Sequence, residues 1–380
     1  MSTLVYNADQ LLLLESARDF LTQEAPVAHF RKIRNEQHPD GLSLPLWKKF
    51  GYMGYAGILI PESLGGMALG HKEVSIVMQE IGRNLTPSPF FTTAILGATA
   101  LNVAGSIAQQ QLYLPGISIG ESLLALAVDE SPKHNPRHIA LEARKDGGDF
   151  RLRGSKTFVV DGHIANSILV VARTGGSNDD TEGLTIFLVD KTSDGLDIER
   201  TVMVDSHNAA RLTFNDVQVP GSAVLGNIDD GWSLLCATLN AGRLAITSEL
   251  LGIADEVFTR TLAHLKERTQ FGKLLGSFQA LQHRLARLYV EIEMGRAALM
   301  NAARALDESN PDSSFLVSVA KSKLGLVASN AAREAVQMHG GMGISDEVDV
   351  GLYMKRVRTL DELFGDHRYH RNQVALANGY

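Results

Sequence analysis

Residues 268–272 combine a cation, an amide and an aromatic ring at the end of a helical pattern. Arg268, Gln270 and Phe271 supply these groups, and Gly272 follows them. A guanidinium fork matches phosphate oxygens and an aromatic face can cover a ring, so this set suits a phosphate-bearing aromatic cofactor. The alternative is a plain helix end in which Gly272 caps the helix over a buried Phe271.

A second candidate segment, residues 337–343, has the sequence Gln-Met-His-Gly-Gly-Met-Gly. Gln337 places an amide at the end of another helical pattern, and Gly340 and Gly341 follow it. Glycines permit left-handed backbone and let a ligand approach the main chain closely. A helix stop without a ligand explains the same residues equally well.

Other chemistries find little support in the sequence. The 12 histidines include no His-Glu-x-x-His pair or comparable ligand set, and no Walker loop is present. Cys236 is the single cysteine, so no intrachain disulfide or multi-cysteine zinc site can form. We expect Cys236 to be a small buried apolar residue.

Composition indicates a globular enzyme. The chain has 380 residues, a net charge of −7 and 44% hydrophobic residues, which fits two or three domains. Mild negative charge without a basic run argues against nucleic-acid binding. No apolar stretch approaches the roughly 20 residues of a membrane span, and the N-terminus does not resemble a signal peptide. We expect a cytoplasmic protein.

Hydrophobic periodicity predicts three domains. Residues 1–122 are mostly helical, with apolar residues three and four apart in 11–22 and 72–83. Residues 123–228 contain short runs of β-branched and aromatic residues between turns. The strands are expected at 124–128, 139–144, 150–160, 167–173, 184–189 and 211–217. Residues 229–380 return to long helices, expected from 278, over 314–339 and from 347 past 360.

The predicted fold class is α+β, with an N-terminal helical bundle, a central antiparallel β domain and a C-terminal bundle of the four-helix type. Strands do not alternate with helices, so a doubly wound nucleotide-binding fold is disfavoured. Some of the long C-terminal helices carry few polar residues, which suggests burial on more than one side and therefore an oligomer.

Together these segments resemble the acyl-CoA dehydrogenase family along nearly the whole chain. The matching pieces occur in the family's order, and they are residues 60–66, 80–83, 125–130, 154–158, 171–174, 214–220, 268–272 with 278–279, and 337–343.

The resemblance implies oxidation of an acyl-CoA thioester to the 2-enoyl-CoA, with FAD as cofactor and electron-transfer flavoprotein as acceptor. A carboxylate would remove the α-proton while hydride leaves the β-carbon for the flavin. The resemblance also implies a tetramer with FAD between the β domain and the C-terminal domain, and it places Arg243 near the acyl-CoA. It assigns FAD contacts to Arg268, Gln270, Phe271, Gln337, Gly340 and Gly341 toward a neighbouring subunit, and to Val128 and Phe158 within the chain's own β domain.

The family's catalytic glutamate has no counterpart here. Alignment on Gly365 places Phe364 at the usual glutamate position. The other position used by some members, one residue before Arg243, is Gly242. Neither residue can accept a proton. If the chain supplies its own base, Asp366 is the best candidate, because it lies one residue after Gly365.

The β domain's share of the flavin site also departs from the family. Asp129 replaces a hydroxyl residue, residues 131–137 replace a Gly-Ser-Asp loop, and Val160 replaces a threonine. An ionised carboxylate only accepts hydrogen bonds, so it would repel an electron-rich flavin carbonyl.

This asymmetry suggests one subunit of a heteromeric acyl-CoA dehydrogenase, which lends its helical edge to FAD held mainly by a paralogous partner. Residues 340–347 and 363–366 resemble the small subunit of pimeloyl-CoA dehydrogenase. The alternatives are a self-sufficient homotetramer with Asp366 as base, a flavin-free structural or acyl-CoA-binding subunit, and a flavin monooxygenase of the same fold.

Overall fold

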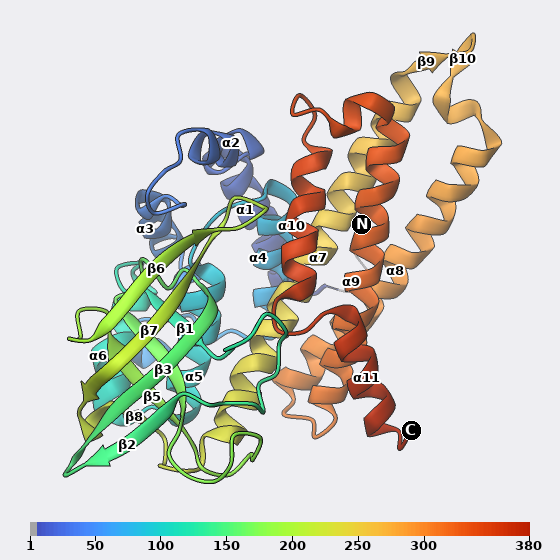
Figure 1. The fold of residues 1–380 in the computed structure, drawn as a ribbon. Coiled ribbons are helices and arrows are strands. Elements are labelled where there is room, and N and C mark those ends of the chain that lie inside the picture. Colours follow the sequence, from blue (N-terminus) through green and yellow to red (C-terminus); the bar gives the residue numbers. More distant parts are fainter. Residues whose placement is uncertain (1–5) are drawn as a thin grey trace. The chain divides into compact units, whose positions relative to one another are not determined.

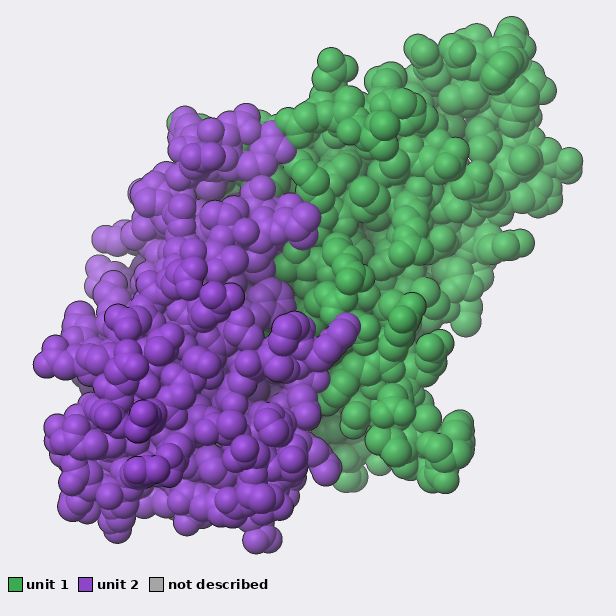
Figure 2. All heavy atoms as spheres, in the orientation of Figure 1, with its two compact units in different colours: residues 1–32, 71–86, 243–380 green, residues 33–70, 87–242 purple. Residues whose placement is uncertain are grey.

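The computed structural model describes residues 6–380. It consists of two compact units, which Figure 2 distinguishes by colour. Unit 1 comprises residues 1–32, 71–86 and 243–380, and unit 2 comprises residues 33–70 and 87–242. The chain therefore contributes three separate segments to unit 1 and two to unit 2.

Helices dominate both ends of the chain (Figure 1). They are α1 (Ala8–Glu24), α2 (Val27–Asn35), α3 (Leu44–Tyr52), α4 (His71–Asn84), α5 (Ala98–Ala104), α6 (Ile107–Ser118), α7 (Gly231–Glu267), α8 (Gln279–Asp307), α9 (Ser313–His339), α10 (Val350–Glu362) and α11 (His367–Ala377), with a π-helical segment at Phe90–Gly97. The helices predicted over 11–22, 72–83, from 278 and over 314–339 are confirmed as α1, α4, α8 and α9.

Local side chains set several helix starts. Asn7 and Gln10 form a capping box at α1, in which each side chain bonds the other residue's backbone N–H. Ser106 and Gln109 repeat the arrangement at α6. The predicted helix from 347 begins later, at Val350.

Unit 2 is built around an eight-stranded sheet with the order β6-β7-β3-β2-β4-β5-β8, and β1 pairs with β4. The strands are β1 (Leu124–Ala127), β2 (Glu142–Asp146), β3 (Asp149–Val160), β4 (Ser167–Arg173), β5 (Leu184–Asp190), β6 (Leu196–Val202), β7 (Asn208–Val219) and β8 (Val224–Leu225). Buried apolar residues of these strands, including Phe150, Leu152, Val170, Phe187 and Phe214, form one core.

The sheet is mixed rather than purely antiparallel, which corrects the prediction. β1 and β2 pair with β4 in parallel, and the remaining pairs are antiparallel. The β2–β3 hairpin lies between β1 and β4 in the chain, so these two strands are free to run in the same direction.

Two strand predictions differ from the structure for local reasons. β6 was not predicted because most of its side chains are exposed, so it lacks the usual apolar alternation. Residues 139–141 were expected to start β2, but the N–H groups of Ala140 and Leu141 donate to the carboxylate of Glu130 instead. These two donors are therefore not available for a strand ladder.

Unit 1 is a helical bundle in which α9 packs against α8, α10 and α11. Helix α4 packs against α1 and α8, and it crosses α7 at two glycines. A Cβ atom on Gly82 would lie 2.3 Å from the carbonyl oxygen of Glu249, and one on Gly252 would lie 1.9 Å from that of Gln79. Only glycine at both positions permits this crossing.

Buried ion pairs connect the helices of unit 1. Glu249, only 2% exposed, pairs with Arg356 at 2.7 Å and links α7 to α10. Glu80, 1% exposed, pairs with Arg18 at 2.9 Å and links α4 to α1. Loss of Arg356 would remove the ion-pair partner of the buried Glu249, so that pair is costly to break, whereas Glu80 also pairs with Arg83 at 3.4 Å.

Among residues 6–380, no helix is both long enough and apolar enough to cross a bilayer. Cys236, expected to be buried, is half-buried on α7.

Candidate active site

The β-domain segment, residues 128–134, starts where strand β1 ends. Val128 is buried, and Asp129 is 8% exposed. The Nδ1 atom of His134 lies 2.8 and 3.0 Å from the two carboxylate oxygens of Asp129. Asp129 therefore pairs with a buried side chain of its own loop, in the part of the family site that would contact the flavin ring.

Glu130, the next residue, connects the β-domain segment to the backbone of residues 140–141 and to Lys156. Its carboxylate accepts hydrogen bonds from the N–H groups of Ala140 and Leu141 at 2.8 and 3.0 Å, and from Lys156 Nζ at 2.7 Å. Lys156 is fully buried and also donates to the carbonyl oxygen of Val128 at 2.9 Å. Burial lowers the pKa of Lys156, while the adjacent Glu130 opposes that shift.

Phe158 lies at a bulge in strand β3. The register of β3 on β7 shifts between Lys156 and Val159, and Phe158 has a positive φ of 56°. The N–H of Thr157 donates to the carbonyl oxygen of Asp129 at 2.7 Å, so β3 and the β-domain segment lie together. The structure thus brings Val128, Asp129 and the Phe158 region into one place.

The helical edge consists of residues 268–272 and 337–341. After α7, strands β9 (Thr269–Gln270) and β10 (Lys273–Leu274) form a small hairpin. Phe271 and Gly272 form its turn with φ values of 54° and 76°, the left-handed pair of a type I′ turn. Phe271 is 89% exposed, so the alternative of a buried phenylalanine at a helix end is wrong.

Glycines follow α9 on the other part of the helical edge. A Cβ atom on Gly340 or Gly341 would have no neighbour within 4 Å. Gly340 has a φ of 62°, which explains why it is glycine, but Gly341 has no positive φ and no packing constraint. The chain's own fold therefore does not require glycine at position 341.

A pair of stacked histidines joins the two parts of the helical edge. The rings of His264 and His339 lie 4.3 Å apart at an angle of 23°. His264 lies one turn before Arg268, and His339 precedes Gly340, so the stack places Arg268 and Gln337 on the same end of the bundle. Burial, then the neighbouring His339 and Arg268, lowers the pKa of His264.

The α10–α11 connection, residues 363–366, contains Phe364 and the candidate base Asp366. Phe364 is only 6% exposed, with a φ of 56°. Asp366 is the N-cap of α11, and its Oδ1 accepts from the N–H groups of Arg368 at 3.1 Å and Tyr369 at 2.7 Å. The candidate carboxylate thus has a structural task of its own.

Three basic side chains hold the carbonyl groups of this connection. Arg243 Nε donates to the Phe364 carbonyl oxygen at 3.2 Å, and His370 Nε2 lies 3.1 Å from the same oxygen. Lys321 Nζ donates to the carbonyl oxygens of Leu360, Asp361 and Gly365 at 2.9, 3.1 and 3.1 Å. Lys321 is completely buried, which lowers its pKa to about 8.

The two glutamate positions are thus occupied by buried residues without acid–base chemistry. Gly242 is buried within α7, and Phe364 is buried in the connection. Arg243, expected near the acyl-CoA, contacts the connection and lies over the ring of Tyr369, with 5.8 Å from Cζ to the ring centroid. These contacts do not test the expected contact of Arg243 with acyl-CoA, which stays a prediction.

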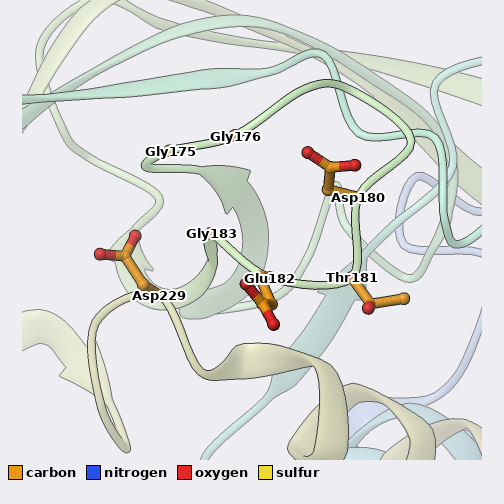
Figure 3. A pocket seen from close by; sticks show the side chains of 7 residues that line it. All are labelled: Gly175, Gly176, Asp180, Thr181, Glu182, Gly183 and Asp229. Carbon is orange, nitrogen blue, oxygen red and sulfur yellow. The ribbon is translucent and has the colours of Figure 1, made fainter.

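An acidic hollow of about 700 Å³ lies beside the β4–β5 loop of unit 2 (Figure 3). Asp180, Glu182 and Asp229 line it together with glycine backbone. Arg173, 6% exposed, holds this loop by donating to the carbonyl oxygens of Asn178, Asp180 and Glu182, among others. Three carboxylates repel phosphate groups, so this hollow is a poor site for a diphosphate.

Residues 116–120 have the sequence Gly-Ile-Ser-Ile-Gly, the pattern of a hydrolase nucleophile elbow. Ser118 is the last residue of α6, is 4% exposed, and donates from its hydroxyl to the carbonyl oxygen of Leu114 at 3.1 Å. It lies in a helix rather than on a strand-to-helix turn, so the pattern carries no nucleophile here.

Sequence reasoning did not single out His134, His264 or Lys321. A histidine five residues after Asp129 was the only sequence signal for the Asp129–His134 pair. No local pattern indicates Lys321, because its partners lie about 40 residues later in the chain.

Three domain models of the acyl-CoA dehydrogenase family match this chain: the N-terminal domain over residues 7–121, the middle domain over 133–217 and the C-terminal domain over 229–377. The probable acyl-CoA dehydrogenase YngJ of Bacillus subtilis is 28% identical, with 97% of each chain covered. CarC, a subunit of the caffeyl-CoA reductase-Etf complex of Acetobacterium woodii, is 28% identical, with 91% of each covered.

A solved structure named the Tcur3481-Tcur3483 steroid ACAD is 29% identical, with 98% of each chain covered and a TM-score of 0.88. The three domain matches together span most of the chain in the order that the motifs predict. The chain belongs to the acyl-CoA dehydrogenase family of oxidoreductases.

Proposed function

We propose that this chain is one subunit of a heteromeric acyl-CoA dehydrogenase that converts an acyl-CoA thioester to the 2-enoyl-CoA. In this proposal the chain lends its helical edge to FAD, and a paralogous partner supplies the other half of the flavin site and the catalytic glutamate. The observation that carries the proposal is the contrast between the two halves of the family's flavin site in this chain.

The β-domain half does not fit a flavin. Flavin carbonyls need hydrogen-bond donors, and the family is made up of FAD-binding flavoproteins. Here Asp129 offers carboxylate oxygens that are already paired with His134, and Glu130 is saturated by two N–H groups and Lys156. The polar groups of this segment already have hydrogen-bond partners within the chain, so a flavin ring placed against them would have to displace those partners.

The helical edge does fit a phosphate-bearing cofactor. Arg268 and Gln270 are exposed at the hairpin, and Phe271 presents an aromatic face to the outside. Gly341 leaves room beside the exposed amide of Gln337 for another molecule to approach the backbone. Arg268 would hold a diphosphate, Phe271 would cover an aromatic ring, and Gln337 and Gly341 would contact the same cofactor.

The chemistry divides between the subunits in the same way. FAD, when bound, supplies the hydride acceptor for the β-carbon. Removal of the α-proton needs a carboxylate, which neither Phe364 nor Gly242 can provide. The base therefore comes from the partner, and this chain's contribution is to bind and orient the cofactor.

The relatives support an electron-transfer partner and a mixed assembly. CarC is named as a subunit of a complex with Etf, which supports electron-transfer flavoprotein as the acceptor. The paired name Tcur3481-Tcur3483 supports an assembly of different chains. We propose a tetramer of two such subunits and two paralogous partners.

A self-sufficient homotetramer with Asp366 as base is the second candidate. In favour of it, Asp366 is one residue from Gly365, on which the family's base segment aligns. Against it, the Asp366 carboxylate caps α11 through two backbone N–H groups, which orient it toward the helix.

The visible absorption spectrum of the chain purified alone, and coexpressed with each paralogue of the same genome, tests the proposal. We expect no flavin in the chain alone and flavin in a mixed tetramer, detected by native mass spectrometry, that bleaches on anaerobic addition of acyl-CoAs. Flavin that is stoichiometric with the chain alone and bleaches with acyl-CoA would overturn it.

Arg268→Ala should lower the flavin content of the mixed assembly at least tenfold, because a charge-assisted phosphate contact is lost. The matched control is Arg287→Ala on α8, which removes an exposed arginine outside the helical edge. Equal flavin loss in both variants would show that Arg268 has no specific role.

A further inference from the structure

A hollow of about 410 Å³ lies in unit 2 where the loop after α2 faces the β6–β7 hairpin. Its charged and polar lining residues are Arg34, Gln37, His38, Arg200, Ser206 and Asn208. None of these residues belongs to the β-domain segment, the helical edge or the α10–α11 connection. The proposed dehydrogenase function leaves this hollow unexplained.

Two arginines from elements far apart in the chain line the hollow. Arg34 lies on α2, and its Nε donates to Asn35 Oδ1 at 3.0 Å. Arg200 lies on β6, and its Nη1 donates to the carbonyl oxygens of Pro39 and His38. These backbone contacts fix the Arg200 side chain against the loop that forms one wall.

The described residues that line the hollow include two arginines and no carboxylate. Two cations that share a hollow repel each other, and an anion between them converts that repulsion into attraction. The acidic residues next to the lining do not belong to it: Asp205 is 3% exposed and accepts from the His207 N–H, and Asp40 lines a separate hollow. Glu199 pairs with Arg211 at 3.3 Å, and Glu36 is exposed beside Gln37.

The backbone of the wall is held in a costly conformation. Gln37 and Ser206 both have positive φ values, 49° and 64°, although neither is glycine. Such residues cluster at ligand sites, where the rest of the fold holds them in place. Gln37, in the loop after α2, and Ser206, in the β6–β7 hairpin, both line the hollow.

We infer that this hollow binds a phosphate ester. Guanidinium forks match phosphate oxygens, and Ser206 and Asn208 add a hydroxyl and an amide to the same wall. The volume falls within the range of about 300–1,000 Å³ typical of small-molecule sites, so it exceeds what a bare phosphate needs. Val202, 58% exposed, and Ile33 supply an apolar surface for the organic part.

Isothermal titration calorimetry of the full-length chain at low ionic strength tests this inference, with AMP, inorganic phosphate and adenosine as probes. AMP should bind, phosphate should bind more weakly, and adenosine should give no heat. Arg200→Gln and Arg34→Gln should each raise the AMP dissociation constant about tenfold or more. Arg211→Gln, on the adjacent strand β7 outside the hollow, should leave it unchanged.

Because Arg200 also holds the loop, a second variant tests charge alone. Val202→Glu places a carboxylate at an exposed position of the hollow without touching the loop contacts, and it should abolish AMP binding. Val204→Glu is the matched control, since Val204 is 62% exposed and outside the lining. No heat with AMP, equal affinity for AMP and phosphate, or unchanged binding in Val202→Glu would each overturn the inference. The test uses the chain without flavin or partner, so its result does not depend on the proposed dehydrogenase role.

Discussion

The β-domain segment and the helical edge, which the proposed function assigns to the two halves of a flavin site, differ in how their groups are satisfied. In the β-domain segment, Asp129, Glu130 and Lys156 find their partners inside the chain. On the helical edge, Phe271 is 89% exposed and Gly341 has open space beside it. The polar groups of the β-domain segment are paired within the chain, whereas the helical edge leaves an aromatic ring exposed and a glycine beside open space.

In the proposed function, this difference is the physical mark of a flavin half-site that no longer binds the cofactor. A polar site without its ligand would leave buried groups unpaired, at a cost of about 1–3 kcal/mol each. The β-domain segment avoids that cost because His134 and Lys156 supply the missing interactions. On the helical edge, by contrast, the ring of Phe271 is exposed to solvent and its backbone has a positive φ.

The largest expected effect comes from breaking the closed region. Lys156→Met should lower the free energy of unfolding by about 3–5 kcal/mol, because it removes the cation of a buried ion pair and leaves the Glu130 carboxylate with two backbone N–H donors and no counter-charge from Lys156. Urea unfolding followed by circular dichroism measures the change.

Lys145→Met is the matched control, since Lys145 lies exposed on the neighbouring strand β2. It should change the unfolding free energy by no more than about 0.5 kcal/mol. A loss below about 1 kcal/mol in Lys156→Met would show that the network does not stabilise the β-domain segment.

A substitution at Gly341 on the helical edge should reduce flavin retention rather than stability. Gly341→Val should leave the unfolding free energy of the chain nearly unchanged, because the new side chain meets open space at an ordinary φ. It should reduce flavin retention in the mixed assembly at least tenfold, because the side chain fills the space that the cofactor needs.

Gly148→Val provides the control for that variant. Gly148 also has open space and no positive φ, but it lies in the β2–β3 hairpin of unit 2. Flavin content measured by absorbance should be normal in Gly148→Val. If Gly341→Val retained its flavin as well, the helical edge would not be a cofactor surface.

Much of the fold followed from local pattern, and the exceptions have physical causes. Helices α1, α4, α8 and α9 were predicted because their apolar spacing is regular and their ends carry breakers. Strand β6 was missed because exposed strands lack an apolar alternation. The parallel pairing of β1 with β4 depends on contacts between distant segments, which periodicity does not encode.

The candidate site divides in the same way. The motif residues of the helical edge are contiguous in sequence, so their grouping at 268–272 and 337–341 was visible before the structure. The Asp129–His134 pair and the clamp of Lys321 on the α10–α11 connection are products of folding. Sequence alone indicated that Asp129 was unusual, but only the structure shows what it contacts.

A smaller effect is expected at Asp366, which tests whether the α10–α11 connection resembles the closed region or a working catalytic segment. Asp366→Ala should lower the free energy of unfolding by about 1 kcal/mol, because the N-cap of α11 is lost. Asp366→Asn should restore most of it, since asparagine caps helices equally well.

Activity separates the capping role from an acid–base role. In the mixed assembly, Asp366→Asn should reduce the flavin with acyl-CoA at the unchanged rate, because the amide keeps the cap and only the ability to accept a proton is lost. Stopped-flow absorbance under anaerobic conditions measures this rate. Loss of reduction in Asp366→Asn, with normal stability, would make Asp366 the base and contradict the proposal that the partner supplies it.

The smallest effect is a pH dependence of the helical edge. Burial, followed by His339 and Arg268, lowers the pKa of His264 below its ordinary value of 6.5. Between pH 6.5 and the lower folded pKa, the unfolded chain binds more protons at this residue than the folded chain does. The stability contributed by neutral His264 is therefore fully present above pH 6.5 and is lost as the pH falls through that window.

Burial also lowers the pKa values of His29 and His163, so these residues contribute to the pH dependence of the wild-type unfolding free energy. The contribution of His264 is therefore measured as a difference between variants. His264→Gln should flatten the fall in unfolding free energy between pH 7 and pH 5, whereas His283→Gln, at an exposed position on α8, should not. If the unfolding free energy of the wild type and of both variants fell equally between pH 7 and pH 5, the His264–His339 stack would not stabilise the helical edge. A flattened slope together with better flavin retention at pH 5 would show that proton uptake at His264 loosens the surface that this chain offers to its partner.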